Sequence, residues 1–300
     1  LDEQSRERET SEPSTMASMQ ETAKKYFRGM QHRKFHESKA CGCKMSLGVY
    51  LPDAYYNDDA PVPVIYYLSG LTCTDENASQ KSGIQRYADE QGVAVVFPDT
   101  SPRGHNVEGE ADSWDFGVGA GFYLNATESK WKHWRMYDYI TKELPVYLAQ
   151  TFPNLDTTNA SLMGHSMGGH GALVIFLKNY NKYKSVSAFS PICNPINCPW
   201  GKKAFGGYLG TNFDAWRDYD ATELARKYPG PKTEIFVDQG TADSFLKEQL
   251  LPENLKNAVH GKDNIDLKLE YRDGYDHSYF YIASFVEEHI LFHAKHLKPS

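Results

Sequence analysis

The 300-residue chain has no long hydrophobic run and no surplus of positive charge. No segment approaches the roughly 18 to 20 apolar residues that a membrane span needs. The opening stretch LDEQSRERETSEPST lacks the apolar centre of a signal peptide. Lys and Arg number 32 against 39 Asp and Glu, a net charge of −7, which gives no basic field to hold nucleic acid or an anionic membrane. We therefore expect a cytoplasmic protein with no nucleic-acid or membrane partner.

Cysteine is also scarce. The five cysteines are an odd number for so long a chain, which predicts free thiols rather than a disulfide framework. Cys41 and Cys43 have no second pair at metal-ligand spacing. His289 and His293 are four residues apart in an expected C-terminal helix, but no third ligand is evident. We predict no metal site, and we expect these histidines to lie at a solvated helix end.

The remaining composition is that of a globular enzyme, with 40% hydrophobic and 13% aromatic residues. Residues 1–20 differ, because they are charged, rich in Ser, Thr and Glu, and almost free of large apolar residues. We predict a disordered tail there. The stretch MASMQ at Met16 has the form of a native start, so we expect the first 15 residues to be an added or upstream-translated remnant. Residues 21–300 contain no repeat or Pro/Gly linker, so we expect one domain.

Short apolar or β-branched runs alternate with longer segments of helical period along the body of the chain. This alternation predicts an α/β fold with a mostly parallel central sheet and helices on both faces. In such folds the chemistry takes place at the carboxyl ends of the strands. We expect strands within residues 45–51, 62–68, 93–98, 160–164, 185–190, 233–239 and 267–271, and helices over 84–91, 133–150, 168–178, 246–259 and 279–296.

One glycine-rich stretch has the form of a nucleophile motif. In SLMGHSMGGHGAL, an apolar run leads into GHSMG, residues 164–168, and a helix-like segment follows at once. A G-x-S-x-G motif in this setting places a serine on a sharp strand-to-helix turn, where the flanking residues must be small. The free N–H groups of the helix then face the developing negative charge. We predict that Ser166 is a nucleophile, and we treat His165 and His170 beside it as structural.

A nucleophilic serine needs a base and a group that orients the base. In α/β-hydrolases the aspartate and then the histidine follow the serine along the chain. Asp243 lies in the loop after the strand at 233–239, and His277 lies in the loop before the last helix. We predict that these two residues complete a triad with Ser166. Asp238 falls inside the strand, so we expect it to be structural.

The tetrahedral intermediate also needs hydrogen-bond donors for its oxyanion. One should be the backbone N–H of Met167, directly after the nucleophile. The other should come from a loop after an earlier strand, and the segment YLSGLTCTDEN supplies one. Gly70 permits a tight turn there, so we predict the N–H of Leu71 as the second donor. An ordinary strand-exit turn is the alternative interpretation.

Several separate segments resemble the S-formylglutathione hydrolase (esterase D) family: YLSGLTCTDEN, PDTSPRG, GEADSWDFGVGAGFYLNAT, MYDYITKELP, GHSMGGHGAL, KSVSAFSPICNPINCPWGKKAF and GYDHSYF. The resemblance implies a cytosolic α/β-hydrolase that uses no cofactor and commonly forms a homodimer. It implies hydrolysis of S-formylglutathione to glutathione and formate, the last step of glutathione-dependent formaldehyde detoxification. The family's triad corresponds to Ser166, Asp243 and His277, and its oxyanion donors correspond to Leu71 and Met167.

Formyl is the smallest acyl group, so bulky side chains should narrow the acyl pocket, and Trp114 and Trp200 are the candidate walls. The family's sensitivity to thiol reagents is associated with the position of Cys73, which is otherwise a small buried hydrophobe. Lys202 and Lys203 could meet the carboxylates of glutathione, although a solvated pair is the simpler interpretation. The alternatives to this function are a broad short-chain carboxylesterase, an acyltransferase and an inactive binding module.

Overall fold

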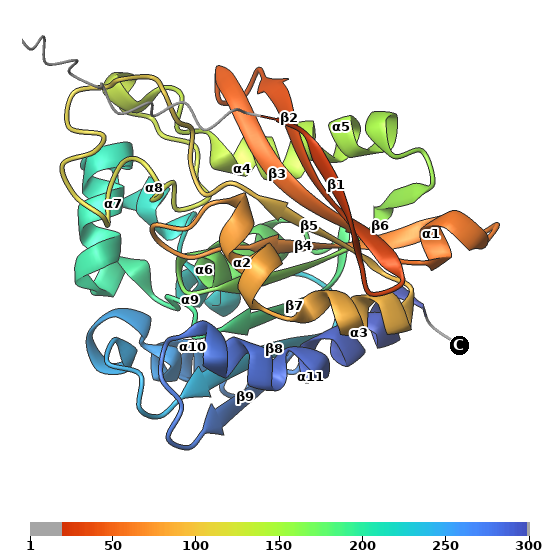
Figure 1. The fold of residues 1–300 in the computed structure, drawn as a ribbon. Coiled ribbons are helices and arrows are strands. Elements are labelled where there is room, and N and C mark those ends of the chain that lie inside the picture. The colour runs from red at the N-terminus through yellow and green to blue at the C-terminus, as the bar shows by residue number, and fades with distance from the viewer. Residues whose placement is uncertain (1–19, 299–300) are drawn as a thin grey trace, which may run out of the picture.

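The apolar runs of the sequence form the inner strands of one sheet in the computed structural model, which describes residues 20–298. The strands are β1 Thr22–Tyr26, β2 Gly29–Ser38, β3 Cys43–Leu51, β4 Val62–Leu68, β5 Ala94–Pro98, β6 Leu155–His165, β7 Tyr183–Phe189, β8 Thr233–Gly240 and β9 Ile265–Arg272. They lie in the order β1-β2-β3-β5-β4-β6-β7-β8-β9 (Figure 1). Pairs from β1 to β5 are antiparallel, and pairs from β5 to β9 are parallel. The prediction of a mostly parallel sheet is confirmed.

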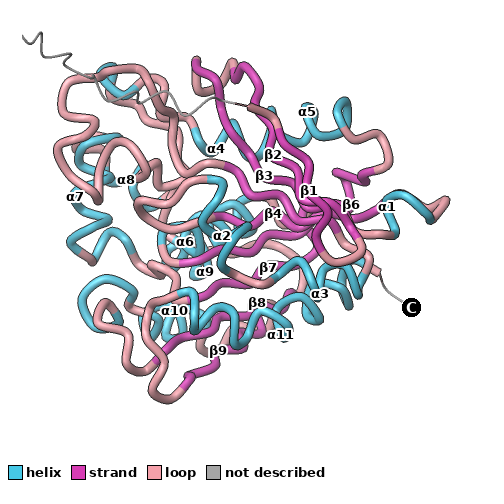
Figure 2. Tube along the Cα trace, viewed as in Figure 1, coloured by secondary structure: helices cyan, strands magenta, loops and turns pink. Residues whose placement is uncertain are grey.

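Helices cover both faces of this sheet (Figure 2). The helices are α1 Ala54–Asn57, α2 Asp75–Lys81, α3 Ile84–Gln91, α4 Met136–Asp138, α5 Leu144–Thr151, α6 Met167–Lys178, α7 Pro199–Leu209, α8 Phe213–Arg217, α9 Ala221–Arg226, α10 Pro252–Val259 and α11 Tyr279–Leu297. On one face of the sheet lie α2, α3 and α11, and on the other face lie α4 to α10.

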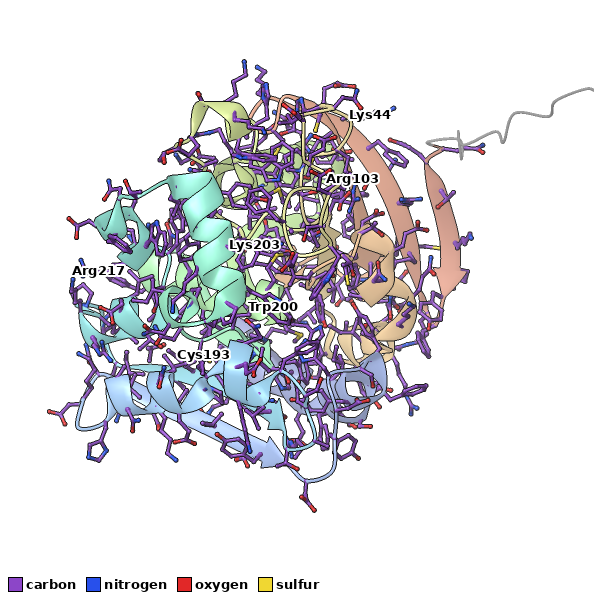
Figure 3. The ribbon with its side chains drawn as sticks, turned by 90° about the vertical axis from the view of Figure 1, so that its left-hand side faces the viewer. Lys44, Arg103, Cys193, Trp200, Lys203 and Arg217 are labelled. Atoms are coloured by element: carbon purple, nitrogen blue, oxygen red, sulfur yellow. The ribbon has the colours of Figure 1, made fainter. Side chains whose placement is uncertain are left out.

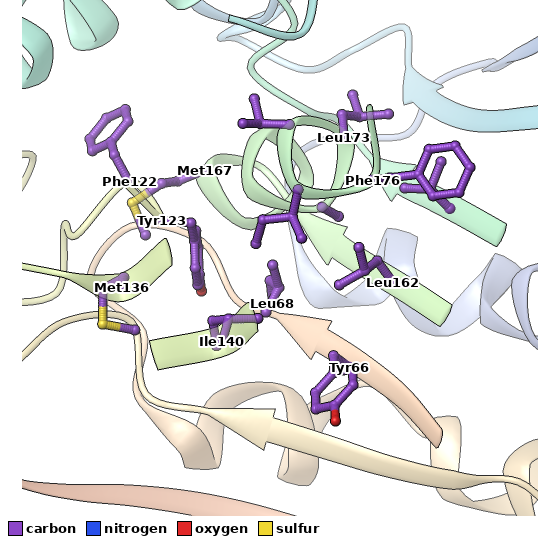
Figure 4. Close-up of a cluster of buried hydrophobic side chains, with 14 of the residues drawn as sticks. Tyr66, Leu68, Phe122, Tyr123, Met136, Ile140, Leu162, Met167, Leu173 and Phe176 are labelled. Carbon is purple, nitrogen blue, oxygen red and sulfur yellow. The ribbon is translucent and has the colours of Figure 1, made fainter. Parts of the chain in front are cut away.

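Strand β4 explains why the inner strands read as continuous apolar runs. All of its residues, VPVIYYL, are buried. Tyr66 and Leu68 point into the core beneath α6, which Figure 4 shows together with Leu173. Ile65 and Tyr67 point into the second core, beneath α3 and α11. A strand that is covered on both faces has no solvent side, so it shows no alternation of polar and apolar residues.

The structure departs from the expected elements at the edges. The hairpin of β1 and β2 was not predicted, because its residues are polar and none of β1 is buried. The single helix expected over 246–259 is interrupted at Leu251, which has a φ of +52°. Pro252 follows it, and the residue before a proline is disfavoured in the helical region. The helices α1, α2, α7, α8 and α9 were also not expected.

Two expectations concern the ends of the chain and membranes. The predicted disordered tail, residues 1–20, lies outside the described residues apart from Gln20. Within residues 20–298, no helix combines the length and the apolar character needed to cross a membrane.

Candidate active site

Ser166 occupies the sharp turn between β6 and α6. Its φ of +56° and ψ of −117° place a non-glycine residue in a strained part of backbone space. Such strain costs about 1–3 kcal/mol and persists only where neighbouring bonds enforce it. Here the Ser166 N–H donates to the carbonyl of Phe189 at 2.9 Å, and its own carbonyl accepts from the N–H groups of His170 and Ile192 at 3.0 and 3.2 Å. These bonds fix the serine at the carboxyl end of β6.

Two glycines make this turn possible. A Cβ atom on Gly164 would lie 2.2 Å from the carbonyl oxygen of Gly168. A Cβ atom on Gly168 would lie 1.9 Å from the carbonyl oxygen of Leu68 in β4. Both distances are far inside van der Waals contact, and in each case the obstacle is backbone. Close packing of α6 against β4 and β6 therefore requires glycine at both flanking positions of the motif.

Asp243 and His277 meet in the loops that follow β8 and β9. His277 Nδ1 lies 2.5 Å from Asp243 Oδ2 and donates to it. The other carboxylate oxygen accepts from the Phe245 N–H at 2.9 Å. Burial alone would raise the pKa of the Asp243 carboxyl, but the hydrogen bond and the electrostatic interaction with His277 outweigh it and hold that pKa below its ordinary value. The carboxylate thus selects the imidazole tautomer that carries its proton on Nδ1, in which Nε2 is the basic nitrogen.

The serine and the histidine line the same cavity, which has a volume of 220 Å³. Within residues 20–298, no direct hydrogen bond joins Ser166 Oγ to the His277 ring, a separation common in enzymes without bound substrate. Five residues predicted for this site share its wall with Ser166, namely Leu71, Cys73, Trp114, Trp200 and His277.

Two backbone N–H groups next to the cavity are free. The residues Gly70 to Cys73 form a turn closed by a hydrogen bond of 3.3 Å from the Cys73 N–H to the Gly70 carbonyl, and Leu71 lies within it. Met167 is the first residue of α6. Among residues 20–298, no group accepts from the N–H of Leu71 or of Met167. An oxygen bound between these residues would therefore meet two donors that have no competing partner.

The aromatic walls of the cavity differ in their exposure. Trp114 is 54% exposed and Trp200 is 6% exposed, and their rings meet edge to face at 5.5 Å. Figure 3 shows Trp200 and Lys203 on the same helix, α7. Lys202 and Lys203 are both exposed, and neither lines the cavity. Lys203 pairs with Asp115 and donates to Ser113 Oγ at 2.6 Å, so its ammonium group is already engaged by a carboxylate of this chain.

Cys73 is 8% exposed, and its Sγ lies 3.9 Å from the hydroxyl of Tyr279. Burial raises the pKa of this thiol, which keeps it protonated at neutral pH.

The histidines beside the nucleophile have different surroundings. His170 Nε2 lies 3.0 Å from the Phe122 carbonyl, and burial lowers the pKa of His170 to about 4. His165 lines the cavity, and its ring centre lies 4.5 Å from that of His277. No local pattern of residues indicates this contact, because it depends on a loop that lies more than a hundred residues further along the chain.

The expectation of a solvated end for His289 and His293 is wrong. Both side chains are fully buried beneath α11. His293 Nδ1 lies 2.7 Å from Ser185 Oγ, and His293 Nε2 lies 2.8 Å from Ser187 Oγ. These serines belong to β7, so the histidine face of the helix packs on the sheet. Asp238 is buried there as well, where it accepts from Arg272 at 2.7 Å, as expected for a structural carboxylate.

Comparisons with known proteins agree with this geometry. A family model described as "Putative esterase" matches residues 38–292. The S-formylglutathione hydrolase of Arabidopsis thaliana is 58% identical over 91% of this chain and 96% of that protein, and the one of Bos taurus is 53% identical over 94% and 99%. The solved structure of an S-formylglutathione hydrolase from Agrobacterium tumefaciens has a TM-score of 0.87 at 45% identity, and covers 92% of this chain and 98% of that one. The chain has the α/β-hydrolase fold and belongs to the S-formylglutathione hydrolase family of esterases.

Proposed function

We propose that this protein hydrolyses the thioester S-formylglutathione to glutathione and formate, with Ser166 as the nucleophile. The observation that carries the proposal is the strained Ser166 turn, which opens into one cavity with the His277–Asp243 pair. The names of relatives that are 51–58% identical support the choice of substrate.

In the first half of the reaction, His277 Nε2 takes the proton of the Ser166 hydroxyl as its oxygen attacks the thioester carbonyl. The Asp243 carboxylate stabilises the imidazolium that forms. The N–H groups of Leu71 and Met167 stabilise the oxyanion. The carbon–sulfur bond then breaks, glutathione leaves as a thiolate, and the imidazolium of His277 returns its proton to that sulfur, which restores the neutral base for the next step. A cysteine thiol has a pKa of about 8.5, so this leaving group needs less help from an acid than an alkoxide does.

In the second half, water attacks the formyl-serine. His277 again takes the proton, the second tetrahedral intermediate collapses, and Ser166 regains its proton as formate leaves. A cavity of 220 Å³ with tryptophan walls suits a small acyl group. The expected selectivity is limited, because one methylene in such a pocket changes binding by only about 1–3 kcal/mol. Short-chain esters should therefore also react.

The test is a comparison of kcat/KM for S-formylglutathione with kcat/KM for a short-chain aryl acetate, with Ser166→Ala as the blank. We expect a preference of several orders of magnitude for the thioester, and none of either activity in the mutant. Equal values for the two substrates would make the protein a broad short-chain carboxylesterase. Full activity in the mutant would overturn the mechanism.

Three finer features complete the proposal. We propose that the reaction ends glutathione-dependent formaldehyde detoxification in the cytoplasm, that it needs no cofactor, and that the protein works as a homodimer. These features rest on the family resemblance. Sedimentation analysis tests the dimer directly. Full activity after exhaustive chelation and dialysis is the outcome expected of a reaction that only the side chains of this chain carry.

A further inference from the structure

The turn that holds Leu71 is strained. Thr72 follows Leu71 and has a φ of +68°, a region that a β-branched residue rarely adopts. Left to itself, Thr72 would relax to a negative φ, and the peptide groups on either side of it would rotate. The direction of the Leu71 N–H therefore depends on the bonds that hold this turn from outside.

Other parts of the chain hold the turn at two points. The Thr72 N–H donates to the Gly119 carbonyl at 2.9 Å. The Cys73 carbonyl accepts two hydrogen bonds, one from Thr100 Oγ1 at 2.5 Å and one from the Arg103 guanidinium, through Nη2, at 3.1 Å. Thr100 and Arg103 both lie in the loop after β5. This loop therefore fixes the peptide group between Cys73 and Thr74, where the chain leaves the turn.

Arg103 is itself held rigidly. Its Nε and Nη2 atoms donate to the two carboxylate oxygens of Asp99 at 2.8 and 2.9 Å. The Asp99 side chain is only 5% exposed, and it also accepts from the Thr100 N–H at 2.7 Å and from Ser46 Oγ at 3.3 Å. The donors of a guanidinium lie in one plane. A bidentate ion pair with a fixed carboxylate therefore also fixes the direction of the hydrogen bond from Nη2 to the Cys73 carbonyl. Figure 3 labels Arg103 on the face of the molecule that also presents Trp200.

We propose that Arg103 is a positioning residue for the reaction, because it holds the strained Gly70–Cys73 turn in the shape that points the Leu71 N–H at the oxyanion. The inference rests on the proposed function in one respect, namely that the acyl group reacts at Ser166. It does not depend on which thioester or ester supplies that acyl group.

The chain offers a matched control. Arg33 forms the same kind of two-point bond, to Asp75, with distances of 2.7 and 3.0 Å. Its side chain is 32% exposed, against 35% for Arg103. Within the described residues, however, Arg33 makes no hydrogen bond to residues 70–73. The two arginines should thus have similar effects on stability but different effects on turnover.

The experiment compares Arg103→Gln, Arg103→Lys and Arg33→Gln in the full chain. The concentration of intact sites is measured by titration with a serine-directed organophosphonate, and kcat and KM are measured with S-formylglutathione and with an aryl acetate. The third measurement is the Kd of a boronic acid, which forms a tetrahedral adduct with the serine. The value of kcat is expressed per titrated serine, so loss of folded protein does not lower it, and KM and Kd do not depend on the enzyme concentration.

Loss of one complete oxyanion donor lowers kcat by about 10²–10³-fold, and a misdirected donor should cost part of that. We expect Arg103→Gln to lower kcat about 10- to 100-fold on both substrates, with KM changed less than about threefold and the Kd of the boronic acid raised in proportion to the loss in kcat. Arg103→Lys should recover only part of the loss, because a point charge cannot reproduce the planar fork. Arg33→Gln should leave kcat unchanged.

Two results would overturn the proposal. One is an unchanged kcat in Arg103→Gln, and the other is an equal loss of kcat in Arg33→Gln, which would mark a general effect of losing a buried ion pair. Because kcat is also measured with the aryl acetate, the effect of Arg103→Gln can be judged even if S-formylglutathione is not the preferred substrate. A wild-type enzyme without a preference for the thioester would contradict the proposed function and leave the comparison of the two arginines intact.

Discussion

Serine, histidine and aspartate side chains come together at two places within residues 20–298 of this protein. Ser166, His277 and Asp243 meet at the cavity, and a second group of the same residue types is buried between α11 and the sheet. Ser185 lies within the regular strand β7, and its hydroxyl meets both Ser161 Oγ and His293 Nδ1 at 2.7 Å. We call this second group, Ser185, Ser187, His289, His293 and Asp238, the buried cluster. All of its side chains are at most 1% exposed.

The two groups differ in whether a substrate can reach them and in whether a ring nitrogen of the histidine is free to accept a proton. Both ring nitrogens of His293 are occupied by serine hydroxyls, so neither can take a proton from a nucleophile. His277 uses one nitrogen for Asp243, and its ring lines a cavity with Ser166. The free backbone donors of Leu71 and Met167 accompany the arrangement at the cavity. Serine, histidine and aspartate near one another are thus insufficient for catalysis, which also needs a strained turn, an unoccupied nitrogen and space for a substrate.

The largest contrast should come from removing each serine hydroxyl. Ser166→Ala is expected to lower kcat by about 10⁶-fold, because no other group can form the acyl intermediate. Ser185→Ala should leave the turnover of folded protein unchanged, since its hydroxyl only completes a hydrogen-bond network. Steady-state kinetics on S-formylglutathione measure both. A large loss of turnover in folded Ser185→Ala would mean that the buried cluster takes part in the reaction.

Replacing each aspartate by asparagine should separate catalysis from stability. Asp243→Asn should lower kcat by about 10⁴-fold with little change in KM, because an amide can hold the imidazole in the wrong tautomer. Asp238→Asn removes one partner of a buried ion pair with Arg272, which should lower the free energy of unfolding by about 3–5 kcal/mol.

Urea denaturation and kinetics per titrated serine distinguish the two effects. If Asp243→Asn kept its turnover, the His277–Asp243 bond would be structural, like the bonds of the buried cluster.

The sequence predicts one of these groups and misplaces the other for a physical reason. Ser166 can be predicted from its neighbours in the sequence. The glycines beside it are required by contacts at the turn, and the order of strand, turn and helix is visible along the chain. The order of Asp243 and His277 after it then follows from the topology. The burial of His293 depends on serines in β7, more than a hundred residues earlier, and a single polar residue on a helix does not reveal such a partner.

The same reasoning applies to the fold and to the remaining site residues. Inner strands such as β4 can be predicted because they are continuous apolar runs in the sequence. Strand β1 is exposed throughout and has no such run. The contacts of Arg103 with Cys73 and of His165 with His277 also join distant segments. Local patterns therefore predict the nucleophile and the core strands, and long-range contacts decide the edges and the supports of the site.

Removing the His293 side chain should destabilise the protein without affecting catalysis. In His293→Ala the hydroxyls of Ser185 and Ser187 each lose one partner, and a cavity is left between α11 and β7. We expect the free energy of unfolding to fall by about 2–4 kcal/mol. Turnover per titrated serine should be unchanged. Urea denaturation gives the first value, and a parallel loss of kcat in the titrated enzyme would couple the buried cluster to the active site.

The smallest expected effect is a change in the pH dependence of stability. Burial holds the pKa of His293 well below its ordinary value, and the neighbouring His289 and His296 lower it further. Between the two pKa values, His293 is therefore protonated in the unfolded chain and neutral in the folded chain. This contribution to stability is fully present above a pH of about 6.5 and is lost as the pH falls toward the folded-state pKa. One such proton corresponds to a slope of about 1.4 kcal/mol per pH unit.

His293→Leu should flatten this slope without removing the helix from the sheet. The leucine fills the buried space, while Ser185 keeps its bond to Ser161 and Ser187 keeps its bond to His289 Nδ1 at 2.9 Å. Urea denaturation at several pH values between about 4.5 and 7 measures the slope for wild type and variant over the range where an ordinary histidine titrates. His260, which follows α10 and is exposed, supplies the control His260→Leu, whose slope should match that of wild type. If His293→Leu kept the full slope, the acid sensitivity would belong to other buried histidines and not to His293.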